Sequence, residues 1–83
     1  MPRMKKNPVL IALGKNVSEL RNKKDLTQEQ LAERSGLDPS YISGIERGVR
    51  NPSVLSLVRL ASGFEVPVSE VCSGLSKQTK QSR

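Results

Sequence analysis

Apolar residues recur along most of this chain at steps of three and four, the spacing of an amphipathic helix. No segment alternates cleanly between apolar and polar residues as a half-buried strand does. The pattern therefore predicts an all-α fold of five helices. The first helix is expected over residues 8–24, with an apolar stripe made of Leu10, Leu13, Val17 and Leu20.

The second predicted helix has clear signals at both ends. The Thr27 hydroxyl can cap the free amides of the first turn, and Gln30, three residues on, completes a capping box. The helix is expected to end at Ser35, because Gly36 suits a left-handed turn.

The third predicted helix begins in the same way. Asp38 is its cap, Pro39 takes the first helical position, and the helix ends near Arg47, before Gly48. Two capped helices separated by a three-residue turn with one glycine are typical of a helix-turn-helix, here from Thr27 to Gly48.

Two further helices complete the pattern. The fourth starts at Ser53, and we expect Leu55, Val58 and Leu60 to be its core residues. The fifth is short, about residues 68–73, and Pro67 marks its start.

Four positions favour DNA binding over a plain helical interaction domain. Ala32 is small where the second helix would cross the third, and Gly36 permits the tight turn. Ile42 and Ile45 would anchor the third helix in the core. A generic helical hairpin needs apolar residues but no particular small residue and glycine at these offsets.

The net charge of +6 on 83 residues sits in the two ends of the chain. Residues 8–75, the expected domain, hold eight basic and eight acidic residues, whereas residues 1–7 and 76–83 hold three basic residues each. We expect both ends to be disordered tails. Basic tails favour phosphate backbones but are also common as solubilising ends, so charge alone is a weak argument.

The composition argues against an enzyme or a metal site. There is no histidine, and the lone Cys72 excludes an internal disulfide and a cysteine-rich zinc site. With no histidine to activate it, we interpret Cys72 as a small buried hydrophobe. The apolar run at residues 9–13 is too short for a signal sequence or a membrane span, so we expect a cytoplasmic protein. We also expect that the protein needs no cofactor.

Residues 9–75 resemble the lambdoid-repressor-like (XRE-type) helix-turn-helix domains of bacterial and phage regulators. The matching stretches are Leu13-Gly14, residues 26–32, Ser35-Gly36-Leu37, Tyr41-Ile42-Ser43, residues 45–48 and Asn51-Pro52-Ser53. Residues 41–47, with Arg50-Asn51 and residues 63–66, are especially similar to controller proteins of restriction–modification systems. The resemblance implies a compact, lambda-repressor-like domain that regulates transcription.

The resemblance also implies which residues face DNA. With Ile42 and Ile45 pointing inward, the opposite face of the third helix would enter the major groove. That face is short of long polar side chains, so we expect Tyr41 and the following loop to supply much of the contact. The predicted DNA-binding set is Gln28, Pro39, Ser40, Tyr41, Ser43, Gly44, Arg47, Arg50 and Asn51.

Three of the polar side chains have competing interpretations. Family members contact a phosphate at the position of Gln28, but this residue also suits the capping chemistry. Tyr41 is either a DNA contact or a core aromatic residue. Glu46 suits a cytosine reader, but the family pattern pairs this position with the arginine that matches Arg21, which favours a structural ion pair.

The chain departs from the family at two turns. The family usually has glycine at the positions of Asp25 and Glu65. Aspartate tolerates left-handed geometry better than most residues, so the first turn is expected to survive. Gly63 precedes Glu65 by two residues, so the sequence leaves open where the fourth helix ends between these two positions.

A further apolar stripe at the fifth helix predicts a symmetric dimer. The expected interface consists of Phe64, Val66, Val68, Val71, Cys72 and Leu75. On this view Val71→Asp gives a folded monomer. The alternative is that the fifth helix folds back as a lid over Leu55 and Val58.

The sequence thus predicts a dimeric regulator without an effector domain or a small-molecule effector, bound to a palindromic double-stranded operator. Two recognition helices would then lie about 34 Å apart. The alternatives are the DNA-binding antitoxin of a toxin–antitoxin pair, and a protein-interaction module with a degenerate helix-turn-helix. The presence of Arg47 and Arg50 argues against the last of these.

Overall fold

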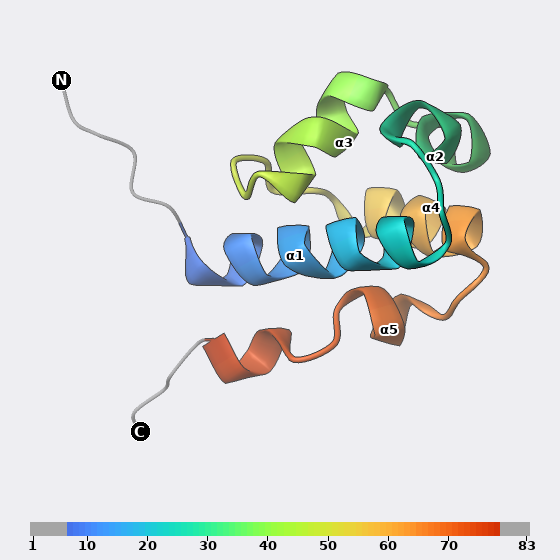
Figure 1. Ribbon diagram of the computed structural model, residues 1–83. Coiled ribbons are helices and arrows are strands. Elements are labelled where there is room, and N and C mark those ends of the chain that lie inside the picture. The colour runs from blue at the N-terminus through green and yellow to red at the C-terminus, as the bar shows by residue number, and fades with distance from the viewer. Residues whose placement is uncertain (1–6, 79–83) are drawn as a thin grey trace, which may run out of the picture.

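The computed structural model describes residues 7–78 and has the expected all-α architecture, with no strand in that range. Its elements are α1 (Pro8–Lys23), α2 (Gln28–Ser35), α3 (Pro39–Glu46), α4 (Val54–Phe64), α5 (Val68–Val71) and the 3-10 helix η1 (Leu75–Gln78). Helix α1 runs through the middle of the domain, with α3 on one side and α5 and η1 on the other (Figure 1). None of these helices is long and apolar enough to cross a membrane.

The predicted helix starts are confirmed by their capping hydrogen bonds. The Thr27 hydroxyl accepts from the Gln30 amide at 3.0 Å, and the Gln30 side chain accepts from the Thr27 amide at 2.9 Å, which completes the capping box. Asp38 accepts from the Ser40 amide, as expected of the α3 cap. Gly36 follows α2 in the left-handed conformation, with φ 73°.

The ends of the domain extend past the expected boundaries. Asn7, assigned to the N-terminal tail by the sequence, caps α1 by accepting the Val9 amide at 2.8 Å. At the other end, η1 packs against α1 and continues the structure to Gln78. The remaining parts of the predicted tails, residues 1–6 and 79–83, lie outside the described residues.

The buried face of α4 differs from the expected one. Leu60 is buried as expected, but Leu55 and Val58 are 60% and 44% exposed. The inward side of α4 is formed instead by Ser56, Leu60, Ala61, Gly63 and Phe64. The sequence analysis considered only apolar residues for this side, whereas the hydroxyl bonds of Ser56 with Ser53 and Tyr41 allow a serine to face inward.

Helix α4 does not end early at Gly63. It continues to Phe64, and Glu65 takes the left-handed conformation (φ 61°) that closes the turn, with the Val66 amide donating to the Ala61 carbonyl. Gly63 serves packing instead, since a Cβ there would lie 3.3 Å from atoms of Leu31 and Ser35. The left-handed turn expected at Asp25 is confirmed, with φ 60°.

Two of the predicted dimer-interface residues belong to the core of the protomer. Phe64 and Val71 are both 0% exposed, so neither side chain is available to a second copy. With Val71 buried, we expect Val71→Asp to disrupt the core and not to give a folded monomer, because the new carboxylate would be buried. Helix α5 does fold back, but onto α1 and α4, and it leaves Leu55 and Val58 uncovered.

Candidate nucleic-acid interface

Close contact between α1 and α3 fixes the position of α3. Gly14 lies at the crossing, where a Cβ would come within 2.6 Å of the Glu46 carbonyl oxygen. On the inward side of α3, Ile42 and Ile45 are fully buried, as the sequence predicted. The opposite side of α3 is consequently directed away from the core.

A bidentate ion pair ties the end of α3 to α1. The Arg21 Nε donates to the Glu46 Oε2 at 2.7 Å, and the Arg21 Nη2 donates to the Oε1 at 3.1 Å. The Arg21 Nη1 also donates to the Leu26 carbonyl at 2.8 Å, which ties in the turn before α2. Hydrogen bonding to Glu46 raises the pKa of Arg21 above its ordinary value. The predicted ion pair is confirmed, so Glu46 is occupied within the protein.

The same carboxylate also holds Gln28. The Gln28 Nε2 donates to the Glu46 Oε1 at 3.0 Å, whereas the capping role considered for Gln28 belongs to Gln30. Because an amide group has two N–H donors, one donor remains for a phosphate oxygen at the start of α2. Glu46 thus fixes the orientation of the side chain of Gln28, the first residue of α2.

The outward face of α3 carries mostly short side chains. Pro39, Ser40 and Arg47 are exposed, and Ser43 is partly buried. The Ser40 hydroxyl donates to the Asp38 carboxylate at 2.8 Å, and the Arg47 Nε donates to the Ser43 hydroxyl at 3.4 Å. The two hydrogen bonds from Ser40 to Asp38, from its amide and from its hydroxyl, hold the pKa of Asp38 below its ordinary value of 3.8.

Gly44 differs from the other residues predicted on this face because it is buried. The stem of Arg50 covers it, so that a Cβ at Gly44 would lie 2.5 Å from the Arg50 Cγ. The place of Gly44 in the predicted DNA-binding set stays a prediction, and in this conformation the Arg50 stem lies between its backbone and solvent. The Arg50 side chain itself is exposed, as is Asn51.

Of the two roles that the sequence left open for Tyr41, the structure supports packing against the core, and the DNA contact stays a prediction. Tyr41 is half-buried against the core, and its hydroxyl donates to the Ser56 hydroxyl of α4 at 3.3 Å. The Arg50 guanidinium carbon lies 5.8 Å from the centre of its ring, within the range of a cation–π contact. Arg50 therefore lies beside α3, although it belongs to the following loop.

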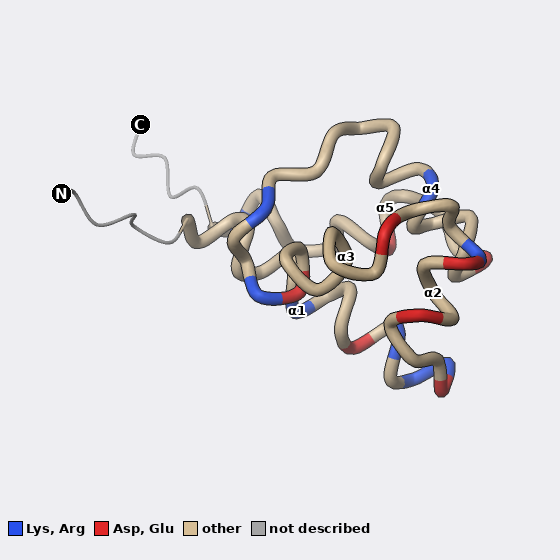
Figure 2. The backbone as a smooth tube through the Cα atoms, turned by 90° about the horizontal axis from the view of Figure 1, so that it is seen from above, with Lys and Arg blue, Asp and Glu red and all other residues tan. Residues whose placement is uncertain are grey.

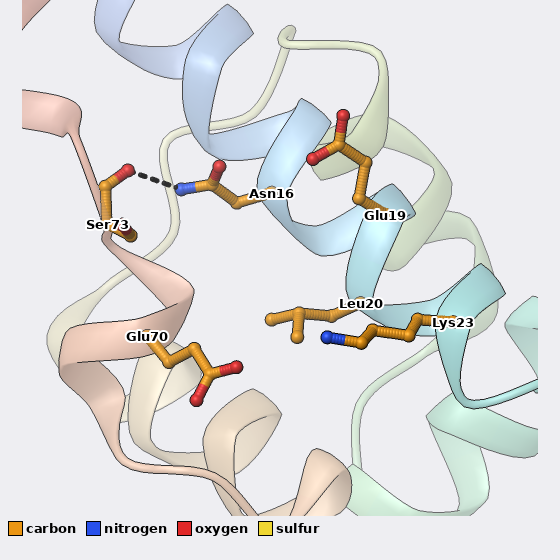
Figure 3. Close-up of a pocket in the computed structure, with 6 residues that line it drawn as sticks. All are labelled: Asn16, Glu19, Leu20, Lys23, Glu70 and Ser73. Carbon is orange, nitrogen blue, oxygen red and sulfur yellow. Dashed lines mark hydrogen bonds between the residues drawn. The ribbon is translucent and has the colours of Figure 1, made fainter.

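A shallow pocket on the opposite side of α1 joins α1 to the C-terminal segment (Figure 3). The Asn16 side chain crosses it and donates to the carbonyls of Val71 and Ser73 at 2.8 and 2.9 Å. We interpret these two hydrogen bonds as the contacts that hold α5 against α1 at this pocket. The nearby Cys72 is partly buried, and burial raises the pKa of its thiol, which disfavours the reactive thiolate.

Sequence reasoning missed the roles of three residues, two that build the interface and one on the opposite side of α1. Ser56 orients Tyr41, Gly14 permits the α1–α3 crossing, and Asn16 holds the C-terminal segment. Gly14 was the detectable one, because glycine inside a predicted helix signals close packing. Basic and acidic residues are interspersed along the described backbone (Figure 2), so charge did not single out this face.

Comparison with known proteins agrees with this geometry. The sequence profile described as "Helix-turn-helix" matches residues 17–71. The control protein C.MunI of Mycoplasma sp. is 37% identical over 73 residues, which cover 87% of this chain and 99% of that protein. The control protein C.SmaI of Serratia marcescens is 42% identical over 59 residues, covering 71% of this chain and 70% of that protein.

Solved structures show the same similarity. The restriction-modification controller protein C.AhdI from Aeromonas hydrophila superposes with a TM-score of 0.74 and 44% identity, over 75% of this chain and 94% of that one. The controller C.Esp1396I, solved bound to a 19 base pair DNA duplex, gives a TM-score of 0.74 with 37% identity, over 88% of this chain and 97% of that one.

Proposed function

The chain belongs to the helix-turn-helix family, and on that premise we propose that it binds double-stranded DNA as a sequence-specific transcription regulator of the restriction–modification controller type. The observation that carries the proposal is the exposed face of α3, flanked by the exposed Arg47 and Arg50 and held in place by the Arg21–Glu46 ion pair. The similarity to C.MunI and to the DNA-bound C.Esp1396I supports it. The protein would act in the cytoplasm by binding alone, without catalysis.

Exposure of the guanidinium groups suits this role. An arginine can donate two parallel hydrogen bonds to guanine or clamp a phosphate. Gln28 adds an amide donor at the start of α2, where the partial positive charge of a helix N-terminus favours a phosphate. Base contacts would thus come from α3 and its following loop, and phosphate contacts from α2.

A mobility-shift titration with the DNA upstream of its own gene tests the proposal. Arg47→Ala and Arg50→Ala are each expected to weaken specific binding by about 1–3 kcal/mol with little change in thermal stability. Exposed Arg59 supplies a matched control, since Arg59→Ala removes an equal charge from α4 and not from α3 or its following loop. Failure of the wild type to distinguish this DNA from unrelated duplex would contradict the proposal.

We also propose that the protein acts as a symmetric dimer on a palindromic operator. One recognition face with so few long polar side chains reads few bases, and a second copy doubles the number of bases that are read. Phe64 and Val71 are buried, so four residues of the predicted dimer interface remain accessible to a second copy. These are Val66, Val68, Cys72 and Leu75, which are all partly exposed.

Sedimentation of charge variants tests this dimer. We expect Val68→Asp to shift the wild-type dimer toward a monomer and to weaken operator binding. Leu55→Asp is the matched control, because Leu55 lies on the exposed apolar side of α4, with Val54 and Val58. If Leu55→Asp alone separates the dimer, the interface lies on α4. A wild type that stays monomeric at tens of micromolar and still binds one half-site would refute the dimer.

A further inference from the structure

We infer that Gly44 is a positioning residue for DNA recognition. Because Gly44 has no side chain, Arg50 can pack against it and against the Tyr41 ring, and this packing holds Arg50 beside α3 as a base-reading side chain. We call the space between Gly44 and Tyr41 that Arg50 occupies the Arg50 seat. This inference rests on the proposed DNA-binding function. It gives a reason why glycine stands in the middle of a helix, where alanine would be more stable by roughly 0.5–1 kcal/mol.

The chain reversal after α3 brings Arg50 back to Gly44. Gly48 adopts the left-handed conformation with φ 78°. The Val49 amide donates to the Gly44 carbonyl and the Gly48 amide donates to the Ile45 carbonyl, both at 3.0 Å. This pair of bonds is a Schellman motif, which turns the backbone sharply at the helix end. Arg50 therefore returns alongside the helix that it follows.

Gly44 leaves the space that the Arg50 stem fills. A Cβ built on Gly44 would lie 2.5 Å from the Arg50 Cγ, 3.3 Å from its Nε and 3.5 Å from its Cδ. The 2.5 Å contact with the Cγ is shorter than real Cβ atoms show, so any side chain at position 44 displaces this conformation of Arg50. Because Arg50 is exposed, its displacement requires no change in the core.

Tyr41 forms the second wall of the seat. Its ring lies under the Arg50 guanidinium, and its hydroxyl donates to Ser56. Ser56 also accepts from the Ser53 hydroxyl at 3.1 Å, within the cap of α4. The ring is thus tied to a second helix, and it offers a fixed face to the guanidinium.

Because Gly44 and Tyr41 hold the Arg50 side chain in one orientation, a base edge is favoured over a phosphate as its target. The other outward side chains of α3 before Arg47 are Pro39, Ser40 and Ser43, which are short. An arginine that is already oriented loses less conformational freedom when its planar fork meets guanine O6 and N7. A phosphate contact needs no such orientation, because it carries no sequence information.

The substitution Gly44→Ala tests the seat. We expect operator affinity to fall by roughly 5- to 150-fold, the worth of one bidentate base contact. Affinity for unrelated duplex is expected to stay unchanged, and the melting temperature to stay equal or to rise, because alanine favours the helix. A purely structural glycine would give the opposite result, with stability and binding falling together.

The same substitution in an Arg50→Ala background is the matched control. Without the Arg50 side chain there is nothing left to displace, so Gly44→Ala is expected to add no further loss. Nitrogen relaxation at the Arg50 Nε in the free protein gives a readout independent of DNA, with order in the wild type and its loss in Gly44→Ala.

Three outcomes would overturn the inference. An undiminished loss in the Arg50→Ala background would mean that position 44 itself meets DNA. Unchanged operator affinity in Gly44→Ala, while Arg50→Ala alone weakens binding, would mean that Arg50 needs no seat, and the proposed function would stand. Equal losses of operator and unrelated-duplex affinity would make Arg50 a phosphate contact. A wild type that binds no operator would instead remove the proposed function as well.

Discussion

Replacing Glu46 by alanine is expected to destabilise the domain strongly, because one carboxylate joins three elements. It accepts from Arg21 of α1 twice and from Gln28 of α2 once, while itself lying at the end of α3. The Glu46 and Arg21 side chains are only 8% and 16% exposed. The change therefore leaves a largely desolvated guanidinium with the Leu26 carbonyl as its remaining partner.

The magnitude follows from this partial burial. Removing one partner of a fully buried ion pair costs about 3–5 kcal/mol. Arg21 keeps some access to water, so we expect about 2–3 kcal/mol for Glu46→Ala. Since 1 kcal/mol shifts the melting temperature of a domain of this size by about 4–8 °C, the expected fall is roughly 10–20 °C.

Thermal unfolding of Glu46→Ala, Arg21→Ala and the double variant measures the coupling between the two side chains. We expect the double variant to be less destabilised than the sum of the two single variants, by about 1–3 kcal/mol. Glu33→Ala on the exposed side of α2 is the matched control, with a change within about 0.5 kcal/mol. A coupling below about 0.5 kcal/mol would refute the reasoning.

Three further outcomes are expected from stability measurements. Asp25→Gly and Glu65→Gly should each raise the free energy of unfolding by a few tenths to about 1 kcal/mol, because both native residues have a positive φ. A fall in the free energy of unfolding would show that the native side chain has another role. Gly14→Ala should cost at least about 1–3 kcal/mol from overpacking against α3, and an unchanged melting temperature would contradict the close crossing. The pKa of Asp38 is lowered by its hydrogen bonds from Ser40, so its stabilisation is complete above the ordinary value of 3.8 and is lost as pH falls through the lowered value. Asp38→Asn should therefore lose less stability on acidification than the wild type, as melting curves over that range would show.

Local signals in the sequence determined the helices and the place of the recognition helix. The side chains of Thr27 and Asp38 accept hydrogen bonds from backbone amides two or three residues away, so the chain itself defines these helix starts. The left-handed turn at Gly36 is equally local. Burial of Ile42 and Ile45 followed from their spacing on α3, and with it the direction of the opposite face.

The ion pair between Arg21 and Glu46 was identified by resemblance to a family rather than by local pattern. The two residues are 25 positions apart, and no periodicity connects them. Only the crossing of α1 and α3 brings them within 2.7 Å.

Tertiary structure alone decided which side of α4 is buried, that Phe64 and Val71 lie in the core, and where the Arg50 side chain packs. Apolar character by itself could not distinguish Leu55, which is exposed, from Phe64, which is buried, because burial depends on which helix lies opposite. Likewise, the meeting of Arg50 with Gly44 depends on the backbone reversal after α3 and on a tyrosine that is held by a different helix. A sequence specifies local hydrogen bonds directly, but it specifies contacts between distant side chains only through the packing of the whole domain.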